Sequence, residues 1–193
     1  AKYLKQFPAF MEFIKASRNN NESEEDETSI IENNEQTPEE SLDKAYQRIR
    51  KSLASELLNK VVDLSPAFFE RLVVELLVKM GYGGSIKDAG KAMGKSGDEG
   101  IDGTIKEDKL GLDIIYIQAK RWKPGNVIGR PELQKFVGAL AGQGAKKGIF
   151  ITTSNFTKEA LDYTPRNETK IVLIDGEQLA QLMIDYNLGC TPQ

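Results

Sequence analysis

Hydrophobic positions in the first part of the chain recur every three to four residues, the period of a helix with one buried face. Two such segments open with helix-start signals. Thr37-Pro38-Glu39-Glu40 supplies a capping box with proline at the first helical position, and Ser65-Pro66 repeats that proline placement. The pattern predicts helices over residues 38–60 and 66–80, with Gly81 ending the second.

The second half changes to short runs rich in β-branched and aromatic residues, separated by further helical patterns. The runs predict strands over 101–106, 113–120, 148–153 and 170–174, and the other segments predict helices over 131–141, 157–163 and 176–186. Because alternating strands and helices favour parallel neighbours, we expect a single α/β domain whose mixed central sheet is flanked by helices.

The charge is unevenly distributed along the chain. Residues 1–43 hold four basic and eleven acidic residues, whereas the remaining 150 hold 22 basic and 18 acidic ones, so the net charge of -3 conceals a mildly basic domain. The run NNNESEEDETSIIENNEQ is polar and self-repelling, which predicts a disordered linker. We therefore expect an acidic linker, residues 1–36, and one domain, residues 37–193. Alternatively, the linker mimics DNA and screens the basic face.

Composition removes several classes of function. The chain has no histidine and a single cysteine, Cys190, which excludes imidazole-based catalysis, multi-cysteine zinc sites and an internal disulfide framework. Carboxylate, amide, lysine and hard-metal chemistry remain. No apolar run approaches the roughly 18 residues of a membrane span, so we expect no membrane partner and a cytoplasmic location.

Polar residues interrupt the ends of two predicted strands. A hairpin turn centred between Lys109 and Gly111 places Asp102 opposite or beside Gln118 and Lys120. Because a buried lysine without a partner is costly, such a cluster requires an ionic partner, water, a metal or a substrate phosphate. The alternative interpretation is that the three residues are solvated strand ends.

Glu70 breaks the apolar face of the helix predicted over 66–80. It shares that face with Val73, Val74 and Leu77, which directs an acidic group towards the core. Alternatively, Glu70 lies at the boundary of the core and its carboxylate reaches water.

Six motifs occur in one order along the chain: SPAFFERLVVELLVKMGYGG, GDEGIDG, YIQAKRW, GRPELQKFVGAL, KGIFITTSNFT and IVLIDGEQLAQLMID. Over residues 37–189 they resemble the catalytic domain of the Mrr-type restriction endonucleases, which belong to the PD-(D/E)XK nuclease superfamily. The resemblance implies a restriction-endonuclease-like core and a metal-dependent endonuclease that restricts foreign or modified DNA. It also implies that residues 1–20 are the tail of an N-terminal winged-helix DNA-binding domain.

The resemblance assigns roles to four residues. The family's acid falls on Asp102, its QxK motif on Gln118 and Lys120, and its helical glutamate on Glu70. Asp102, Gln118 and Glu70 would hold Mg²⁺, with Mn²⁺ as a substitute, and Lys120 would orient the attacking water. Glu99 departs from the family's GDGGIDG, and is either a loop residue or an added charge beside the metal.

A basic and aromatic group follows the QxK motif and is suited to DNA. Arg121, Trp122, Lys123 and Arg130 offer phosphate contacts and stacking, and Gln134 is a further candidate on the next helix. As alternatives, Trp122 caps the core, the cations are solvated and Gln134 is a surface residue. Because cutting both strands usually needs two active sites, we expect a homodimer. The alternative function is a non-cleaving DNA-binding or interaction module.

Three consecutive hydroxyl residues, Thr152, Thr153 and Ser154, follow the buried part of the strand predicted over 148–153. Their hydroxyls either meet phosphate or cap the following helix, and capping is the favoured role. The glycines Gly138 and Gly142 favour close helix packing, because no phosphate-binding glycine motif accompanies them.

Overall fold

The computed structural model describes residues 37–83, 100–123, 125–163 and 168–191. The chain divides into two compact units, Ala1–Tyr46 and Gln47–Gln193. The predictions for residues 1–36 and for Glu99 lie outside the described residues. In the described part of the first unit, the predicted capping box is present: the amide of Glu40 donates to Thr37 Oγ1 at 3.2 Å and the amide of Thr37 donates to Glu40 Oε2 at 3.1 Å.

The order of helices and strands agrees with the prediction. The elements are α2 (Pro38–Asp63), α3 (Pro66–Lys79), β1 (Gly103–Lys106), β2 (Ile114–Lys120), β3 (Val127–Ile128), α5 (Arg130–Gly142), β4 (Lys147–Thr152), β5 (Asn155–Phe156), α6 (Lys158–Leu161), β6 (Lys170–Ile174) and α7 (Gly176–Asp185). The two-residue strands β3 and β5 were not predicted, because two residues are too few to show a period. Among the described helices, none is long and apolar enough to cross a membrane.

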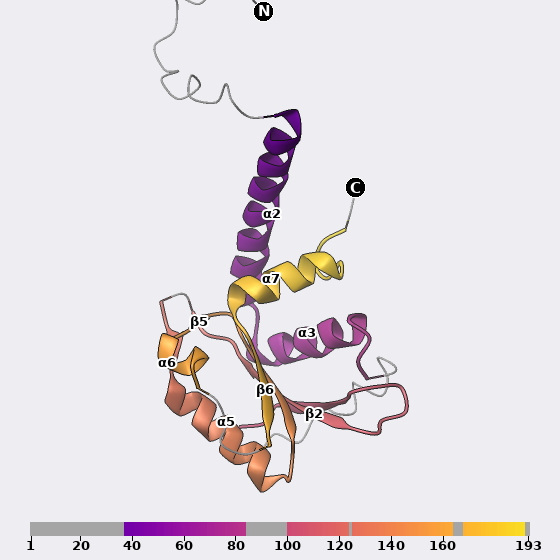
Figure 1. Cartoon of the computed structure of the whole chain (residues 1–193), viewed down its shortest axis with the longest axis vertical. Coiled ribbons are helices and arrows are strands. Elements are labelled where there is room, and N and C mark those ends of the chain that lie inside the picture. The colour runs from indigo at the N-terminus through magenta and orange to yellow at the C-terminus, as the bar shows by residue number, and fades with distance from the viewer. Residues whose placement is uncertain (1–36, 84–99, 124, 164–167, 192–193) are drawn as a thin grey trace, which may run out of the picture. The chain divides into compact units, whose positions relative to one another are not determined.

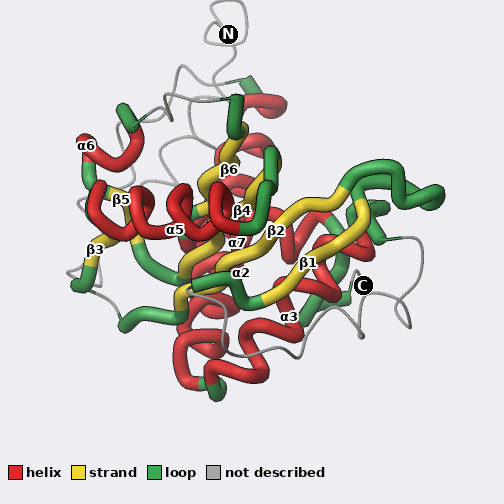
Figure 2. The backbone as a smooth tube through the Cα atoms, turned by 90° about the horizontal axis from the view of Figure 1, so that it is seen from below, coloured by secondary structure: helices red, strands yellow, loops and turns green. Residues whose placement is uncertain are grey.

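The main sheet is mixed, as predicted. Its strand order is β1-β2-β4-β6, with β1 antiparallel to β2 and with β2, β4 and β6 mutually parallel (Figure 2). The helices α3 and α7 cover one face and α5 with α6 covers the other (Figure 1). The strands β3 and β5 pair in parallel as a separate small sheet, which joins the chain segments that follow β2 and β4.

Two apolar clusters, one on each face of the sheet, fix which way the residues of β2 point. The larger cluster packs α3, α7 and the end of α2 against Ile115 and Ile117 of β2. The smaller cluster packs α5 and α6 against Phe150 of β4, with Tyr116 at its margin. Because side chains alternate along a strand, Gln118 lies on the α5 face and Ala119 on the α3 face.

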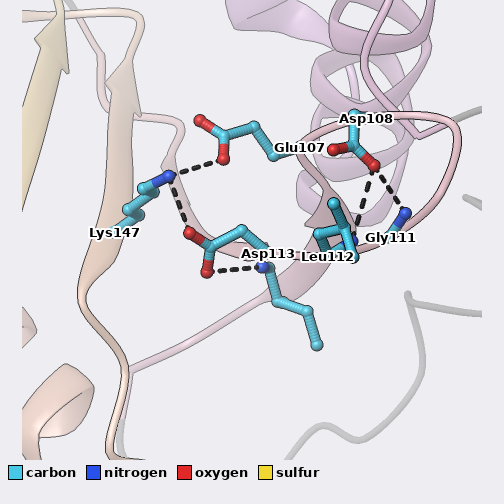
Figure 3. Close-up of polar contacts among 7 residues, drawn as sticks. Glu107, Asp108, Gly111, Leu112, Asp113 and Lys147 are labelled. Carbon is cyan, nitrogen blue, oxygen red and sulfur yellow. Dashed lines mark hydrogen bonds and ion pairs between the residues drawn. The ribbon is translucent and has the colours of Figure 1, made fainter.

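The β1–β2 hairpin sets the register that brings the predicted site together. Its pairs run from Gly103↔Ile117 to Lys106↔Ile114, so the turn is centred at Leu110, as predicted. Asp108 shapes that turn, since its Oδ1 accepts from the amide of Leu110 at 2.8 Å. The same oxygen accepts from the amide of Gly111 at 2.6 Å (Figure 3). Gly111 has φ +72°, and a Cβ there would lie 2.9 Å from Lys106 Cδ, so glycine is required.

Lys147 of β4 holds the two arms of this hairpin against the next strand. Its Nζ bonds to the carboxylates of Glu107 and Asp113, the latter at 2.8 Å (Figure 3). These contacts raise the pKa of Lys147 and lower that of Asp113. The hairpin register is therefore supported at its tip by both backbone and side-chain contacts.

Candidate active site

Asp102 lies one residue before β1, where the hairpin register places it opposite Gln118. Its amide donates to the carbonyl of Ile117 at 2.9 Å. Its carboxylate Oδ2 accepts from the amide of Ala119 at 2.7 Å, so the side chain is held against the end of β2. The predicted proximity of Asp102 and Gln118 along the hairpin is therefore present.

Glu70, in the first half of α3, shares a pocket with Asp102. The cavity has a volume of about 10 Å³, close to the least that holds one water molecule, and is lined by Glu70, Val74, Asp102, Gly103, Ile117 and Ala119. Burial raises the pKa of Glu70, and the negative charge of Asp102 raises it further. Glu70 is half-buried at the boundary of the core, and its carboxylate and that of Asp102 form an acidic pair.

The donor set of this pocket fits a hard cation. The negative charge of Asp102 disfavours ionisation of Glu70, a positive charge between the two carboxylates would relieve that repulsion, and oxygen donors are those that Mg²⁺ prefers. Within the described ranges, no group of three or more His, Cys, Asp or Glu side chains is arranged to hold a metal. The site therefore offers two anionic ligands, and further donors have to come from neutral groups or water.

Gln118 is close to this pocket in sequence but points elsewhere. It is 4% exposed, lies on the α5 face and is not among the residues that line the pocket. Its carboxamide packs beneath Gly100, where a Cβ would lie 3.2 Å from Nε2, and the φ of Gly100 is +107°. The backbone conformation favours glycine at position 100, and a side chain there would also press against the Gln118 carboxamide. The structure thus brings Glu70 to Asp102, and directs the Gln118 side chain to the opposite face.

Lys120 ends β2 on the same face as Gln118 and is half-buried. Its ammonium forms no ion pair with any of the residues that the structure describes. Its carbonyl accepts from Thr152 Oγ1 at 2.8 Å and from the amide of Thr153 at 3.3 Å. The backbone of Lys120 is therefore fixed while its charge stays available.

The residues predicted to bind DNA occupy different environments. Lys123, Arg130 and Gln134 are exposed, and the Arg130 guanidinium lies 5.4 Å from the centre of the Tyr163 ring. Trp122 is half-buried and packs against the smaller apolar cluster, which fits the alternative that it caps the core.

Arg121 points away from this group and towards the end of α2. Its Nη1 donates to the carbonyl of Val62, and its Nε is buried with no hydrogen-bond partner among the described residues. A cation at a helix C-terminus binds carbonyls that the helix leaves unpaired. This placement favours a structural role for Arg121 over a phosphate contact.

The roles predicted for the hydroxyls of Thr152, Thr153 and Ser154 are wrong. All three residues are buried, and their hydroxyls donate to backbone carbonyls of the last residue of β2 and of the segment after it. The cap of α6 is Thr157 instead, whose Oγ1 accepts from the amide of Ala160. The run of hydroxyl residues at the end of a buried strand is visible in the sequence, but the sequence does not show which segment these hydroxyls bind.

Three comparisons with known proteins bear on this site. Residues 61–183 match the model of the Mrr catalytic-domain family, described as "Restriction endonuclease". The type IV methyl-directed restriction enzyme EcoKMrr of Escherichia coli (strain K12) is 49% identical over 153 residues, which are 79% of this chain and 49% of that protein. The chain thus spans about half the length of this relative.

The third comparison is structural. The DNA modification-dependent restriction endonuclease AspBHI superposes with a TM-score of 0.51 at 14% identity, over 72% of this chain and 36% of that one. At this identity the likeness establishes the fold, and the expected restriction-endonuclease-like core is confirmed.

Proposed function

Because the chain belongs to the Mrr catalytic-domain family of restriction endonucleases, we propose that it is the nuclease part of an enzyme that cleaves modified DNA. The observation that carries this proposal is the pairing of Glu70 and Asp102 in one pocket, at the strand end that bears Lys120. The name of the E. coli relative, a methyl-directed enzyme, supports methylated DNA as the substrate. We assign the activity to residues 37–193.

Mg²⁺ is the proposed cofactor, with Mn²⁺ as a substitute. Glu70 and Asp102 would be its anionic ligands, because their carboxylates share the pocket and the pKa of Glu70 is raised. The carbonyl oxygen of Gln118 would join them only after its side chain turns from the α5 face. When bound, Mg²⁺ supplies positive charge that polarises the scissile phosphate and lowers the pKa of a water molecule.

Lys120 has a separate role in the proposed reaction. Lys120 ends β2, the strand whose Ala119 amide holds Asp102, and a cation at this strand end would stabilise negative charge as it develops on the phosphate and orient the attacking water. Asp102 keeps its position through the amide of Ala119, so the acid and the lysine are both held by the end of β2.

DNA would lie along the exposed side chains that follow this strand. Lys123 and Arg130 are suited to phosphate contacts, Gln134 to a polar contact, and the exposed edge of Trp122 to stacking. Arg121 donates a hydrogen bond to the Val62 carbonyl, so we assign it a structural role. Hydrolysis of both strands usually needs two such sites, and we propose that the enzyme acts as a homodimer in the cytoplasm.

Plasmid cleavage tests the proposed function. Methylated and unmethylated supercoiled plasmids are incubated with the chain in Mg²⁺, Mn²⁺ or EDTA, and nicked and linear products are measured on gels. We expect cleavage of methylated plasmid with either metal and none in EDTA. Asp102→Asn should abolish cleavage, whereas Lys109→Ala, an exposed lysine at the hairpin tip, should cleave as the wild type does. Cleavage that persists in EDTA would refute the metal assignment, and DNA binding without cleavage would indicate a binding module.

A further inference from the structure

The end of β2 and described residues of the segment that connects it to α5 accept hydrogen bonds from hydroxyls at the end of β4 and directly after it. We infer that Thr152 and Thr153 are positioning residues of the nuclease: Thr152 fixes Lys120, and Thr153 fixes Trp122 and, through it, the DNA-contacting segment. The inference rests on the proposed function of Lys120 and Lys123.

Thr152 acts at the last residue of β2. It is fully buried and is paired with Lys120 in the parallel register. Its Oγ1 donates to the Lys120 carbonyl at 2.8 Å and accepts from the amide of Ser154 at 3.1 Å. A strand normally frays where its pairing ends, but here a side chain continues the hydrogen bonding from the neighbouring strand. The backbone from which the Lys120 ammonium extends is therefore fixed.

Thr153 satisfies both backbone groups of one residue outside regular secondary structure. It is 4% exposed, and its Oγ1 donates to the Trp122 carbonyl at 2.7 Å while it accepts from the Trp122 amide at 2.9 Å. A single hydroxyl thus takes the place of a strand partner for Trp122. A neighbour such as Lys123 has its backbone placed by the same contact.

The contacts continue to the start of α5. Ser154 Oγ donates to the carbonyl of Asn126, and then β3 and β5 pair through Val127↔Asn155 and Ile128↔Phe156. Connections between strands and helices are usually mobile, but in this one buried hydroxyl groups bind the backbone. Groups that are held in place before the substrate arrives lose less entropy in the transition state. These hydroxyl contacts therefore support both the cleavage step and DNA binding.

The two threonines should affect different kinetic constants. Thr152→Val removes the hydroxyl that fixes Lys120, and we expect kcat to fall about tenfold or more with KM nearly unchanged. Thr153→Val frees the Trp122 backbone, and we expect KM and the Kd for DNA to rise about fivefold, with a smaller change in kcat. Thr152→Ser and Thr153→Ser keep the hydroxyl and should restore each constant to near the wild-type value.

The control is Thr157→Val, which removes a hydroxyl bond within α6 and keeps the backbone amide that donates to Ile128. Cleavage of methylated plasmid and DNA affinity are measured for the full chain and each variant, with rates taken per folded molecule. Thr152→Ala and Thr153→Ala repeat the measurement if a valine variant fails to fold. We expect the control to lower the melting temperature and leave kcat and KM unchanged.

Each outcome decides the inference. If the valine or alanine variants change kcat and KM no more than Thr157→Val does, or if the serine variants are as impaired as the others, the positioning role is refuted. If Lys120→Ala lowers cleavage strongly and Thr152→Val cleaves at the wild-type rate, the inference fails and the proposed function survives. A wild-type chain that cleaves no modified DNA would overturn both.

Discussion

The acidic pair offers a test of the metal site that does not depend on activity. Glu70→Gln replaces one of two carboxylates in the shared pocket with a neutral group of the same shape. Because the pKa of Glu70 is raised in the folded chain, first by burial and then by Asp102, the folded state holds this proton to a higher pH than the unfolded state. Ionising Glu70 therefore lowers stability as pH rises through its pKa, and removing the charge should stabilise the metal-free protein at pH 7.

The expected effect of Glu70→Gln on the free energy of unfolding is small, and its sign depends on whether metal is bound. Electrostatic interactions between partly exposed groups are screened by solvent, and about 0.5 kcal/mol is the size expected for such a pair. For a unit of this size that is about 1–2 °C in melting temperature. Metal at ten times its Kd would stabilise the wild type by about 1.4 kcal/mol, or roughly 3–5 °C. Glu70→Gln loses an anionic ligand and should lose most of that gain.

Thermal unfolding measures both effects. In EDTA at pH 7 we expect Glu70→Gln to melt above the wild type, and in saturating Mg²⁺ we expect the order to reverse. In EDTA the difference should disappear as the pH falls below the usual glutamate range, because Glu70 is then protonated in the folded and unfolded states alike. Glu75→Gln, at an exposed position of α3, serves as the control and should follow the wild type. An equal Mg²⁺ response in the wild type and Glu70→Gln would refute the assignment of Glu70 as a ligand.

Three further predictions concern the surroundings of this pair. Lys120→Ala should leave folding and DNA affinity intact and lower cleavage by about two orders of magnitude, and single-turnover rates would check this. Urea unfolding should show Gly100→Ala to be more destabilising than Gly125→Ala, by about 1 kcal/mol, because both glycines have positive φ but Gly100 also approaches Gln118; equal losses would refute the contact. Replacing Lys123 and Arg130 by alanine should reduce the salt dependence of DNA binding by about two counterion units, and an unchanged slope would show that both are only solvated.

Local sequence patterns carried much of the fold. Capping signals and helical periods gave α2 and α3 to within a few residues, and short apolar runs gave the four strands of the main sheet. The hairpin arithmetic also gave the position of Asp102 opposite Gln118, because pairing in an antiparallel hairpin is set by the residues of one turn. In each case the partners are close in sequence, so the interaction that decides the structure is visible in the sequence itself.

The tertiary structure decided how the chemically important side chains are divided between the faces of the sheet. The sequence spacing of Gln118 is the same whether its side chain faces a metal or lies under Gly100. Arg121 is predicted from sequence to bind DNA, but in the structure it donates to the Val62 carbonyl of α2. Likewise the hydroxyls of Thr152 and Thr153 find partners about thirty residues earlier in the chain. Sequence therefore determined the elements and the hairpin register through local hydrogen bonding and burial. The assembly of the site depended on packing between distant segments, which no local pattern encodes.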